Sequence, residues 1–136
     1  CDCGPQLDAS LDAMARHARE DGGWGILLYM RQEGRGIGLI NKLRAYRLQA
    51  QGFDTVAANQ RLGLPDEARD FPVAARMLEL IGATKIRLLT NNPAKVKALE
   101  DHGITVAERV QHQLPDNPHN ARYLATKRDR SGHLLT

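Results

Sequence analysis

Amphipathic helical patterns alternate with short apolar runs along this chain, and the alternation restricts its fold more than any other feature. Residues 7–20 carry apolar side chains at helical spacing, and the run GILLYM (25–30) has the length of a strand covered on both faces. In the same way we expect helices over 39–52, 72–82 and 91–103 and strands over 84–90 and 104–110. This order predicts the α/β class, with a single domain in which helices flank a largely parallel or mixed sheet.

The stretches between these elements are expected to be mostly irregular. FDTVAANQ (53–60) is interpreted as a short strand or loop, and residues 61–71 as a turn. The segment from residue 111 onward is polar and predicts a loop followed by a short helix near 121–128.

The composition fits one domain, covering 1–136, and excludes some classes of protein. With 136 residues, 42% of them hydrophobic, the chain can bury a core without disulfides. The formal net charge of +3 suits an anionic small molecule as well as it suits nucleic acid. Nucleic-acid binding is the weaker hypothesis, because the basic residues are not segregated and aromatic residues for base stacking are few. We find no apolar run long enough for a membrane and no signal-peptide pattern, so we expect a cytoplasmic protein with no membrane or nucleic-acid partner.

Two strand ends carry polar residues that favour an anion site. Glu33 and Arg35 lie in a glycine-rich loop directly after the strand expected at 25–30, and Thr90 ends the strand expected at 84–90. Lys95 falls in the first turn of the next helix, where the helix dipole disfavours a cation, so a bound anion would relieve it. Because neither loop has the spacing of a dinucleotide or phosphate-loop motif, simple chain reversal is the competing interpretation.

The only cysteines, Cys1 and Cys3, are one residue apart. A disulfide between them would close a strained ring, and a zinc site needs about three or four protein ligands. Either a ligand is missing or the pair is incidental. The five histidines form no cluster with the spacing of metal ligands, so we expect them on the solvated surface. The charged run KRDR (127–130) is interpreted as a solvent-exposed face of a helix.

The stretch PDEARDF crowds three carboxylates and an arginine into one turn. It fits a solvated helix start, in which Asp66 and Glu67 lie favourably near an N-terminus. It fits equally a carboxylate–arginine pair at a reaction centre, involving Arg69. Sequence spacing does not choose between these two interpretations.

Five segments together give the chain a family resemblance: CDCGPQL, LLYMRQEGRGIGLINKLRAYRLQ, DTVAAN, LLTNNPAK and YLATKRDRSGHLL. They resemble GTP cyclohydrolase II, a zinc enzyme that opens the guanine imidazole ring of GTP at C8 in the first step of riboflavin biosynthesis. The resemblance implies release of formate and pyrophosphate and the product 2,5-diamino-6-hydroxy-4-(5-phosphoribosylamino)pyrimidine. It also implies a homodimer.

The resemblance gives the cysteine pair a role. The family holds one Zn²⁺ per subunit with three cysteines, of which the last two match Cys1 and Cys3, while the first lies upstream of this chain. The chain therefore resembles the carboxyl-terminal, larger part of the catalytic domain, with its amino-terminal segment missing. Mg²⁺ is expected with the substrate phosphates.

The same matching implies a set of site residues. Those expected to bind GTP are Gln6, Glu33, Gly34, Arg35, Thr55, Thr90 and Lys95. In the hydrolytic centre Arg69 matches the family pattern D-x-R-D, as nucleophile at the α-phosphate or as phosphate clamp. The acid position falls on Glu67, with Asp66 one residue early, so either carboxylate is a candidate. Tyr46 is expected to donate or relay a proton.

Other functions remain open from the sequence. An enzyme of the same kind that keeps the formyl group would fit the same motifs. A GTP-binding module without full turnover is a second alternative, because the zinc ligands are incomplete and the acid is altered.

Overall fold

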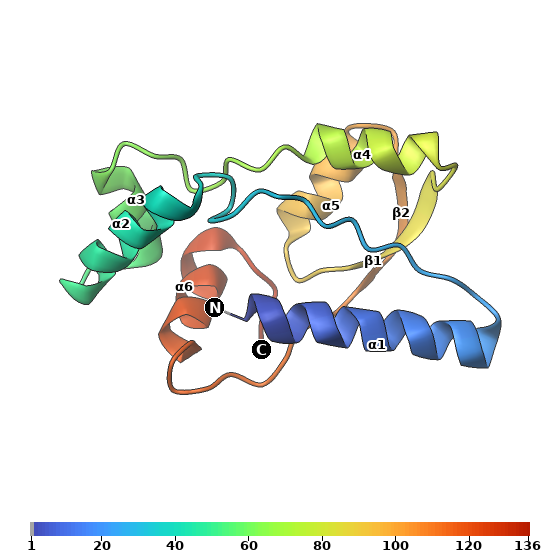
Figure 1. Ribbon diagram of the computed structural model, residues 1–136, viewed down its shortest axis with the longest axis horizontal. Coiled ribbons are helices and arrows are strands. Elements are labelled where there is room, and N and C mark those ends of the chain that lie inside the picture. The colour runs from blue at the N-terminus through green and yellow to red at the C-terminus, as the bar shows by residue number, and fades with distance from the viewer. Residues whose placement is uncertain (1) are drawn as a thin grey trace.

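A computed structural model describes residues 2–136, within which six helices accompany one sheet of two parallel strands (Figure 1). The elements are α1 (Cys3–Asp21), α2 (Leu39–Ala50), α3 (Thr55–Arg61), α4 (Phe71–Leu80), β1 (Lys85–Leu89), α5 (Pro93–Glu100), β2 (Thr105–Val110) and α6 (Ala121–Ser131). This arrangement confirms the predicted α/β class and the parallel sheet.

The sheet and its crossover helix form the centre of the fold. β1 pairs with β2 from Lys85 opposite Thr105 to Leu89 opposite Val110, and α5 connects the two strands. The apolar face of α4 packs on α5, which packs in turn on β2. The core cluster between these elements consists of Ala75, Leu78, Ala83, Leu99 and Ile104.

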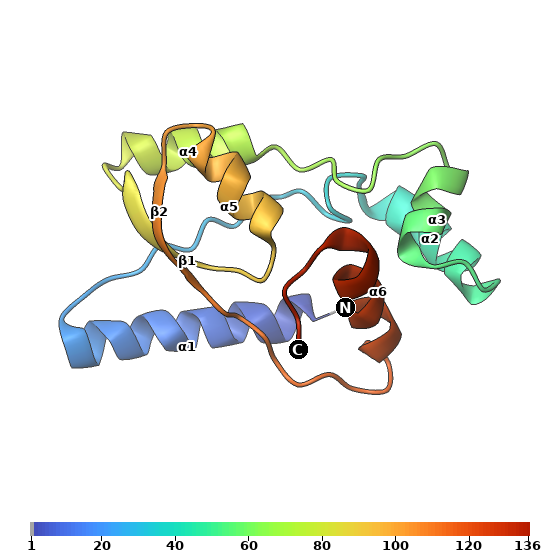
Figure 2. The same ribbon diagram turned by 180° about the vertical axis from the view of Figure 1, so that it is seen from behind.

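The prediction of a strand at residues 25–30 is wrong. This segment makes no ladder with either strand, although it runs close to β1 in both ribbon views (Figures 1 and 2). Ile26 and Leu28 pack against the core cluster, whereas Leu27 and Tyr29 are exposed. The segment thus covers the core with alternate side chains, and an apolar run does not reveal that its backbone lacks a pairing partner.

The interpretation of 53–60 as a strand or loop is also wrong, because α3 occupies most of it. The Asp54 carboxylate caps the helix by accepting a hydrogen bond from the Ala57 amide at 2.9 Å. Val56 and Ala58 are buried where α3 packs on α2, around Ala45. The β-branched residues of this short helix therefore reflect packing against α2 rather than a strand.

The predicted helices at 7–20, 39–52, 72–82 and 91–103 are confirmed, with ends one to a few residues different. At α5 the cap is as expected: the Asn92 side chain accepts a hydrogen bond from the Ala94 amide at 3.0 Å, and Pro93 opens the helix. The short helix expected near 121–128 is α6, which continues to Ser131.

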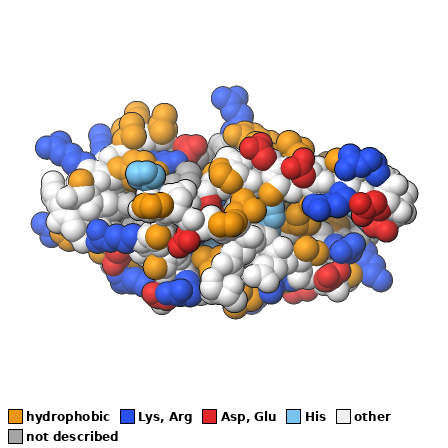
Figure 3. All heavy atoms as spheres, turned by 90° about the horizontal axis from the view of Figure 1, so that it is seen from below, with side chains coloured by type: hydrophobic (Ala, Val, Ile, Leu, Met, Phe, Trp, Pro, Cys, Tyr) orange, Lys and Arg blue, Asp and Glu red, His pale blue; other side chains and the backbone are white. Residues whose placement is uncertain are grey.

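The two ends of the chain lie close together in the fold (Figures 1 and 2). The start of α1 lies beside α6 and the carboxyl terminus. α2 and α3 form one end of the molecule, and the last turns of α1, together with α4, form the other (Figures 1 and 2). Charged side chains of both signs are mixed with hydrophobic ones on the face in Figure 3. Among residues 2–136, no helix combines the length and apolar character that crossing a membrane requires.

Candidate functional site

A cavity of about 550 Å³ lies where β1 ends, between the loop 31–38, the start of α1 and the carboxyl-terminal segment. Its size falls in the usual range for small-molecule sites, about 300–1,000 Å³. Six of the seven residues predicted to bind GTP line it: Gln6, Glu33, Gly34, Arg35, Thr90 and Lys95. Cys3 and Arg69 also line this cavity.

The end of β1 is the most buried wall. Thr90 is 5% exposed, and its hydroxyl oxygen accepts a hydrogen bond from the Asn92 amide at 3.1 Å. Arg109 of β2 donates to the Thr90 carbonyl at 3.0 Å. These bonds fix the turn between β1 and α5, and with it the position from which Lys95 projects.

Lys95 is half-buried in the first turn of α5, and its side-chain ammonium has no hydrogen-bond or ion-pair partner among residues 2–136. Burial lowers its pKa, and the charges of Arg69 and Lys127 lower it further, with Glu67 opposing them. A half-buried ammonium among other cations is unfavourable unless an anion joins it. This wall therefore suits a negatively charged ligand.

The glycine-rich loop 31–38 is fixed by its backbone. Arg35 adopts a positive φ of 59°, and its carbonyl accepts a hydrogen bond from the Ala68 amide at 2.9 Å. A side chain at Gly36 would bring a Cβ to 2.3 Å from the Ala68 carbonyl oxygen, so only glycine permits this approach. The loop is thereby joined to the segment that carries Glu67 and Arg69.

Glu67 and Arg69 form the carboxylate–arginine pair that the sequence left as one of two interpretations. Arg69 donates to Glu67 through Nε at 2.6 Å and Nη2 at 2.5 Å, a two-pronged contact. Arg35 adds a third bond to the same carboxylate at 3.3 Å. Burial by itself raises the pKa of Glu67, but the hydrogen bonds and charge of Arg69, together with Arg35, outweigh it and hold this pKa below its ordinary value. Glu67 is therefore an ionised carboxylate that orients two guanidinium groups.

Glu33 is held in a second ion pair. Its Oε1 accepts hydrogen bonds from Lys42 at 2.7 Å and from the Gly34 amide at 2.9 Å. The bond from Lys42, followed by that from Gly34, lowers the pKa of Glu33. Among the described residues its Oε2 has no hydrogen-bond partner, so this oxygen is available to a ligand.

Four predicted site residues lie outside the cavity lining: Thr55, Tyr46, Asp66 and Glu67, the last of which bonds to the lining residues Arg35 and Arg69. Thr55 opens α3, and Tyr46 lies on α2 with 42% of its surface exposed and its ring 5.8 Å from the Lys42 ammonium. Asp66 is near Glu67 in the chain, yet its Oδ1 is buried without a hydrogen-bond partner in the described part of the protein. The cavity thus gathers most of the predicted residues but not these.

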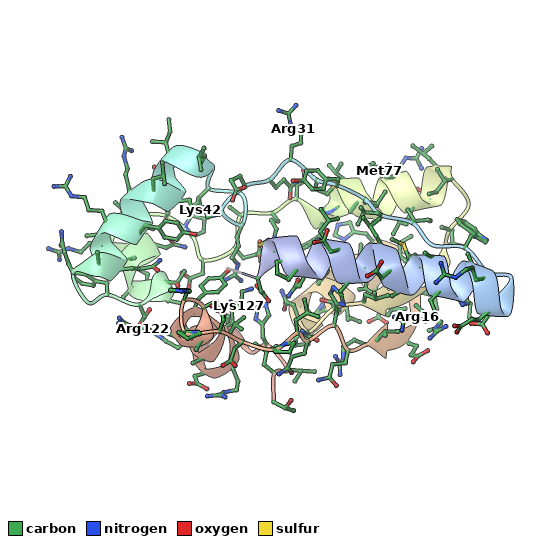
Figure 4. The ribbon with its side chains drawn as sticks, turned by 60° about the horizontal axis from the view of Figure 1, so that its bottom comes forward. Arg16, Arg31, Lys42, Met77, Arg122 and Lys127 are labelled. Atoms are coloured by element: carbon green, nitrogen blue, oxygen red, sulfur yellow. The ribbon has the colours of Figure 1, made fainter. Side chains whose placement is uncertain are left out.

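The carboxyl-terminal segment adds residues that sequence reasoning missed. Lys127 lines the cavity beside the first turn of α1 (Figure 4) and donates to the Asp2 carboxylate at 3.3 Å. The expectation of solvated histidines is wrong for His112 and His133, which also line the cavity. His112 lies two residues after the end of β2, so the strand-end argument that found Thr90 would have found it too. No such signal marks Lys127, because a charge run on a helix looks the same on a solvated and a cavity-facing side.

A metal site is only partly represented. Cys3 begins α1, is exposed and carries a free thiol, whereas Cys1 lies outside the described residues. No group of three or more histidine, cysteine, aspartate or glutamate side chains that could hold a metal ion occurs among residues 2–136. The described residues alone therefore do not fit a zinc centre.

Comparison with known proteins agrees with the site. The family model described as GTP cyclohydrolase II matches residues 1–111. GTP cyclohydrolase-2 of Pseudomonas putida strain W619 is 58% identical over 99% of the chain, and that of Neisseria gonorrhoeae strain FA 1090 is 54% identical over 100%. The chain spans 63% of the length of the Pseudomonas protein and 66% of the Neisseria protein. It belongs to the GTP cyclohydrolase II family.

Proposed function

We propose that this chain forms the larger part of a GTP cyclohydrolase II catalytic domain. The reaction would open the guanine imidazole ring of GTP at C8, releasing formate and pyrophosphate, as the first step of riboflavin biosynthesis. The observation that carries the proposal is the cationic cavity at the end of β1, where Lys95 has no partner in the described part of the chain. Its charge and volume suit a nucleoside triphosphate.

The triphosphate binds at the cationic side of the cavity. Arg69, Arg35 and Lys95 all line the cavity, and the first two are already oriented by Glu67. Arg31 also contributes to the lining, but its side chain points away from the body of the protein (Figure 4). Charge-assisted hydrogen bonds from preoriented guanidinium groups are among the strong contacts available to phosphate.

The guanine base binds near Glu33 and Gln6. The free Oε2 of Glu33 suits the N–H donors of the guanine edge, and the low pKa of this carboxyl keeps it ionised. Gln6 donates to Asp2 at 2.5 Å, which leaves its own oxygen free to accept a bond. Recognition of donors by acceptors gives specificity, because a base without those donors leaves the protein oxygens unpaired.

Arg69 acts as a phosphate clamp rather than as a nucleophile in this proposal. A guanidinium stays protonated at neutral pH, and the hydrogen bonds and charge of Arg69 hold the pKa of the Glu67 carboxyl below its ordinary value. Transfer of the guanidinium proton to so weak a base is strongly unfavourable. Glu67 instead holds the guanidinium in place, and its remaining N–H groups are left for the phosphates. Asp66 stays the alternative acid.

Zinc and magnesium are further parts of the proposal. We place Zn²⁺ at Cys1 and Cys3 with a third ligand from outside this chain, supported by the position of the Cys3 thiol on the cavity. Such a metal would supply an activated water. Mg²⁺ binds through the substrate phosphates, as it commonly does. Zinc content of the full-length protein and of its Cys3→Ser variant tests the ligand assignment.

The homodimer is supported by apolar side chains that face solvent in the single chain. On α2 they are Leu39, Ile40, Leu43 and Tyr46, which are between 42% and 69% exposed. Burying such a row in a subunit contact is favourable. The cytoplasmic location and the roles of Thr55 and Tyr46 stay predictions.

Mass spectrometry of the products tests the proposed function. The full-length protein is incubated with GTP, Mg²⁺ and zinc, and we expect formate, pyrophosphate and the diaminopyrimidine nucleotide. A product that retains the formyl group would favour the alternative ring-opening enzyme. Intact GTP with zinc bound would contradict the proposal and leave a GTP-binding module.

A further inference from the structure

The carboxyl-terminal segment, residues 112–136, lies beyond the part matched by the family model and yet closes one side of the cavity. Its return is fixed by hydrogen bonds at three places. The Leu134 amide donates to the Asn91 carbonyl at 2.8 Å, and the Gln113 side chain donates to the Thr136 carbonyl at 2.7 Å. The His112 Nε2 lies 2.8 Å from the Gln6 carbonyl oxygen. This segment is therefore a wall of the site.

Within this wall, the imidazole of His133 has no role in the site as described so far. Gly132 ends α6 in the left-handed conformation, and the His133 amide then donates to the Lys127 carbonyl at 3.1 Å. The ring is half-buried, with Nδ1 at 3.2 Å from the Ser131 carbonyl oxygen. Because a carbonyl only accepts, Nδ1 carries the proton there. Nε2 is left as a lone-pair acceptor, without a hydrogen-bond partner among residues 2–136.

Several charged groups share the cavity with this ring. The cations are Lys127 from α6, Lys95 from α5, and Arg31, Arg35 and Arg69 from the loops. The carboxylates are Asp2, before α1, and Glu33, and the other titratable groups are those of Cys3, Tyr29, His112 and Tyr123. Lys127 is balanced by Asp2, and Glu67 holds both arginines. Burial lowers the pKa of His133, and Lys127, then Arg35 and Arg69, add to this effect against the bond to Ser131. Without a ligand the ring is neutral at pH 7.

A bound polyphosphate would favour the protonated form of the His133 ring. Its negative charge neutralises the cations that disfavour imidazolium, and a phosphate oxygen accepts a hydrogen bond from Nε2 only if that nitrogen is protonated. Glutamine or asparagine at this position would need no such proton. The position of the ring therefore predicts a contact that forms together with proton uptake.

We propose that His133 is a phosphate ligand, and that its Nε2 takes a proton from solvent as the polyphosphate binds and donates it in a hydrogen bond to a phosphate oxygen. The inference rests on the proposed function, because it needs a polyphosphate in this cavity. No covalent bond forms or breaks, and the buffer supplies the proton. It gives the carboxyl-terminal segment a direct part in substrate binding.

Isothermal titration calorimetry of the full-length protein tests the proposal. The ligand is an α,β-methylene analogue of GTP, titrated at pH 7.5 into buffers of different ionisation enthalpy, so that the heat reports protons taken up. We expect net uptake by the wild type, loss of most of it in His133→Gln, and about tenfold weaker binding in that variant. His102→Gln, at an exposed histidine after α5, is the matched control and should equal the wild type.

A second measurement does not depend on a variant. The imidazole resonances of His133 are followed by NMR through a pH titration with and without the analogue, and the ligand should raise its pKa. Equal proton uptake by wild type and His133→Gln, or an unchanged His133 titration in the complex, would overturn the inference and leave the proposed function standing. Failure of the wild type to bind the analogue at all would overturn both.

Discussion

The two walls of the cavity treat positive charge differently. On one wall Arg35 and Arg69 share the carboxylate of Glu67, whereas on the other Lys95 is half-buried with no partner among residues 2–136. A paired guanidinium is held in a fixed geometry, while an unpaired ammonium keeps its whole charge for a ligand at a cost in stability. The difference separates a wall that orients the substrate from a wall that attracts it.

Removing Arg69 should have the largest effect. Arg69→Ala deletes the clamp and leaves Glu67 with only the longer bond from Arg35, so we expect kcat for pyrophosphate release to fall about 10³-fold. Single-turnover assays of pyrophosphate measure it. Arg87→Ala is the control, because Arg87 makes an exposed pair with Glu108 away from the cavity. A fall of less than tenfold in Arg69→Ala would remove the arginine wall from the mechanism.

Lys95→Met should separate binding from stability. We expect about 100-fold weaker binding of the GTP analogue, together with a gain in the free energy of unfolding of about 1 kcal/mol at pH 7. The sign follows from the lowered pKa of Lys95: the cost of burying its charge is fully present at neutral pH and disappears as the pH rises towards 10.5. The stability gain should therefore shrink as the pH approaches 10.5.

Calorimetry and urea denaturation check the two parts of this prediction. Lys97→Met is the matched control, since Lys97 is an exposed residue of the same helix paired with Asp101. A Lys95→Met protein that loses stability, with binding intact, would mean that Lys95 has a structural role and that the walls do not differ as described.

Gly36→Ala tests the contact between the loop 31–38 and the segment that carries Glu67 and Arg69. The new Cβ would meet the Ala68 carbonyl, and the backbone φ of 92° adds strain, so we expect a loss of about 2 kcal/mol in the free energy of unfolding. Gly38→Ala shares a positive φ of 84° but has open space around its Cβ and should lose about 1 kcal/mol. Equal losses in the two variants would show that the contact with Ala68 does not hold the loop.

The smallest effect is expected from Glu67→Gln. The amide keeps the size of the side chain but weakens its hold on Arg69, so kcat should fall about tenfold while the analogue binds at least as tightly. Because the pKa of Glu67 is lowered on folding, its contribution to stability is present above pH 4.5 and is lost as the pH falls through the folded pKa. Unfolding curves from pH 6 to 3 should show this loss in the wild type but not in the variant.

Local signals predicted the β1–α5–β2 unit well and the regions around it less well. Asn92, Pro93 and the strand-end position of Thr90 are short-range features, and they led directly to Lys95. The segment 25–30 was misassigned because its alternating burial depends on a core formed by later residues. α3 was missed although Asp54 is an ordinary N-cap, since its β-branched residues resemble those of a strand.

The cavity shows the same division between local and long-range information. Its strand ends and glycine loop could be identified from composition and spacing. The family resemblance added Gln6 and favoured the reaction-centre interpretation of Arg69. Lys127 and His133 could not be identified from the sequence as cavity residues. They reach the cavity only because the carboxyl-terminal segment returns to the start of α1. Such a contact is set by tertiary packing and leaves no pattern in the local sequence.

The most direct test of the account is a crystal structure of the full-length protein with the α,β-methylene analogue of GTP. We predict phosphate oxygens within hydrogen-bond distance of the Lys95 ammonium and the Arg69 guanidinium, with Arg69 still held by Glu67. An analogue bound elsewhere, or one whose phosphates leave Lys95 without an anionic partner, would contradict the claim that this cavity is the substrate site.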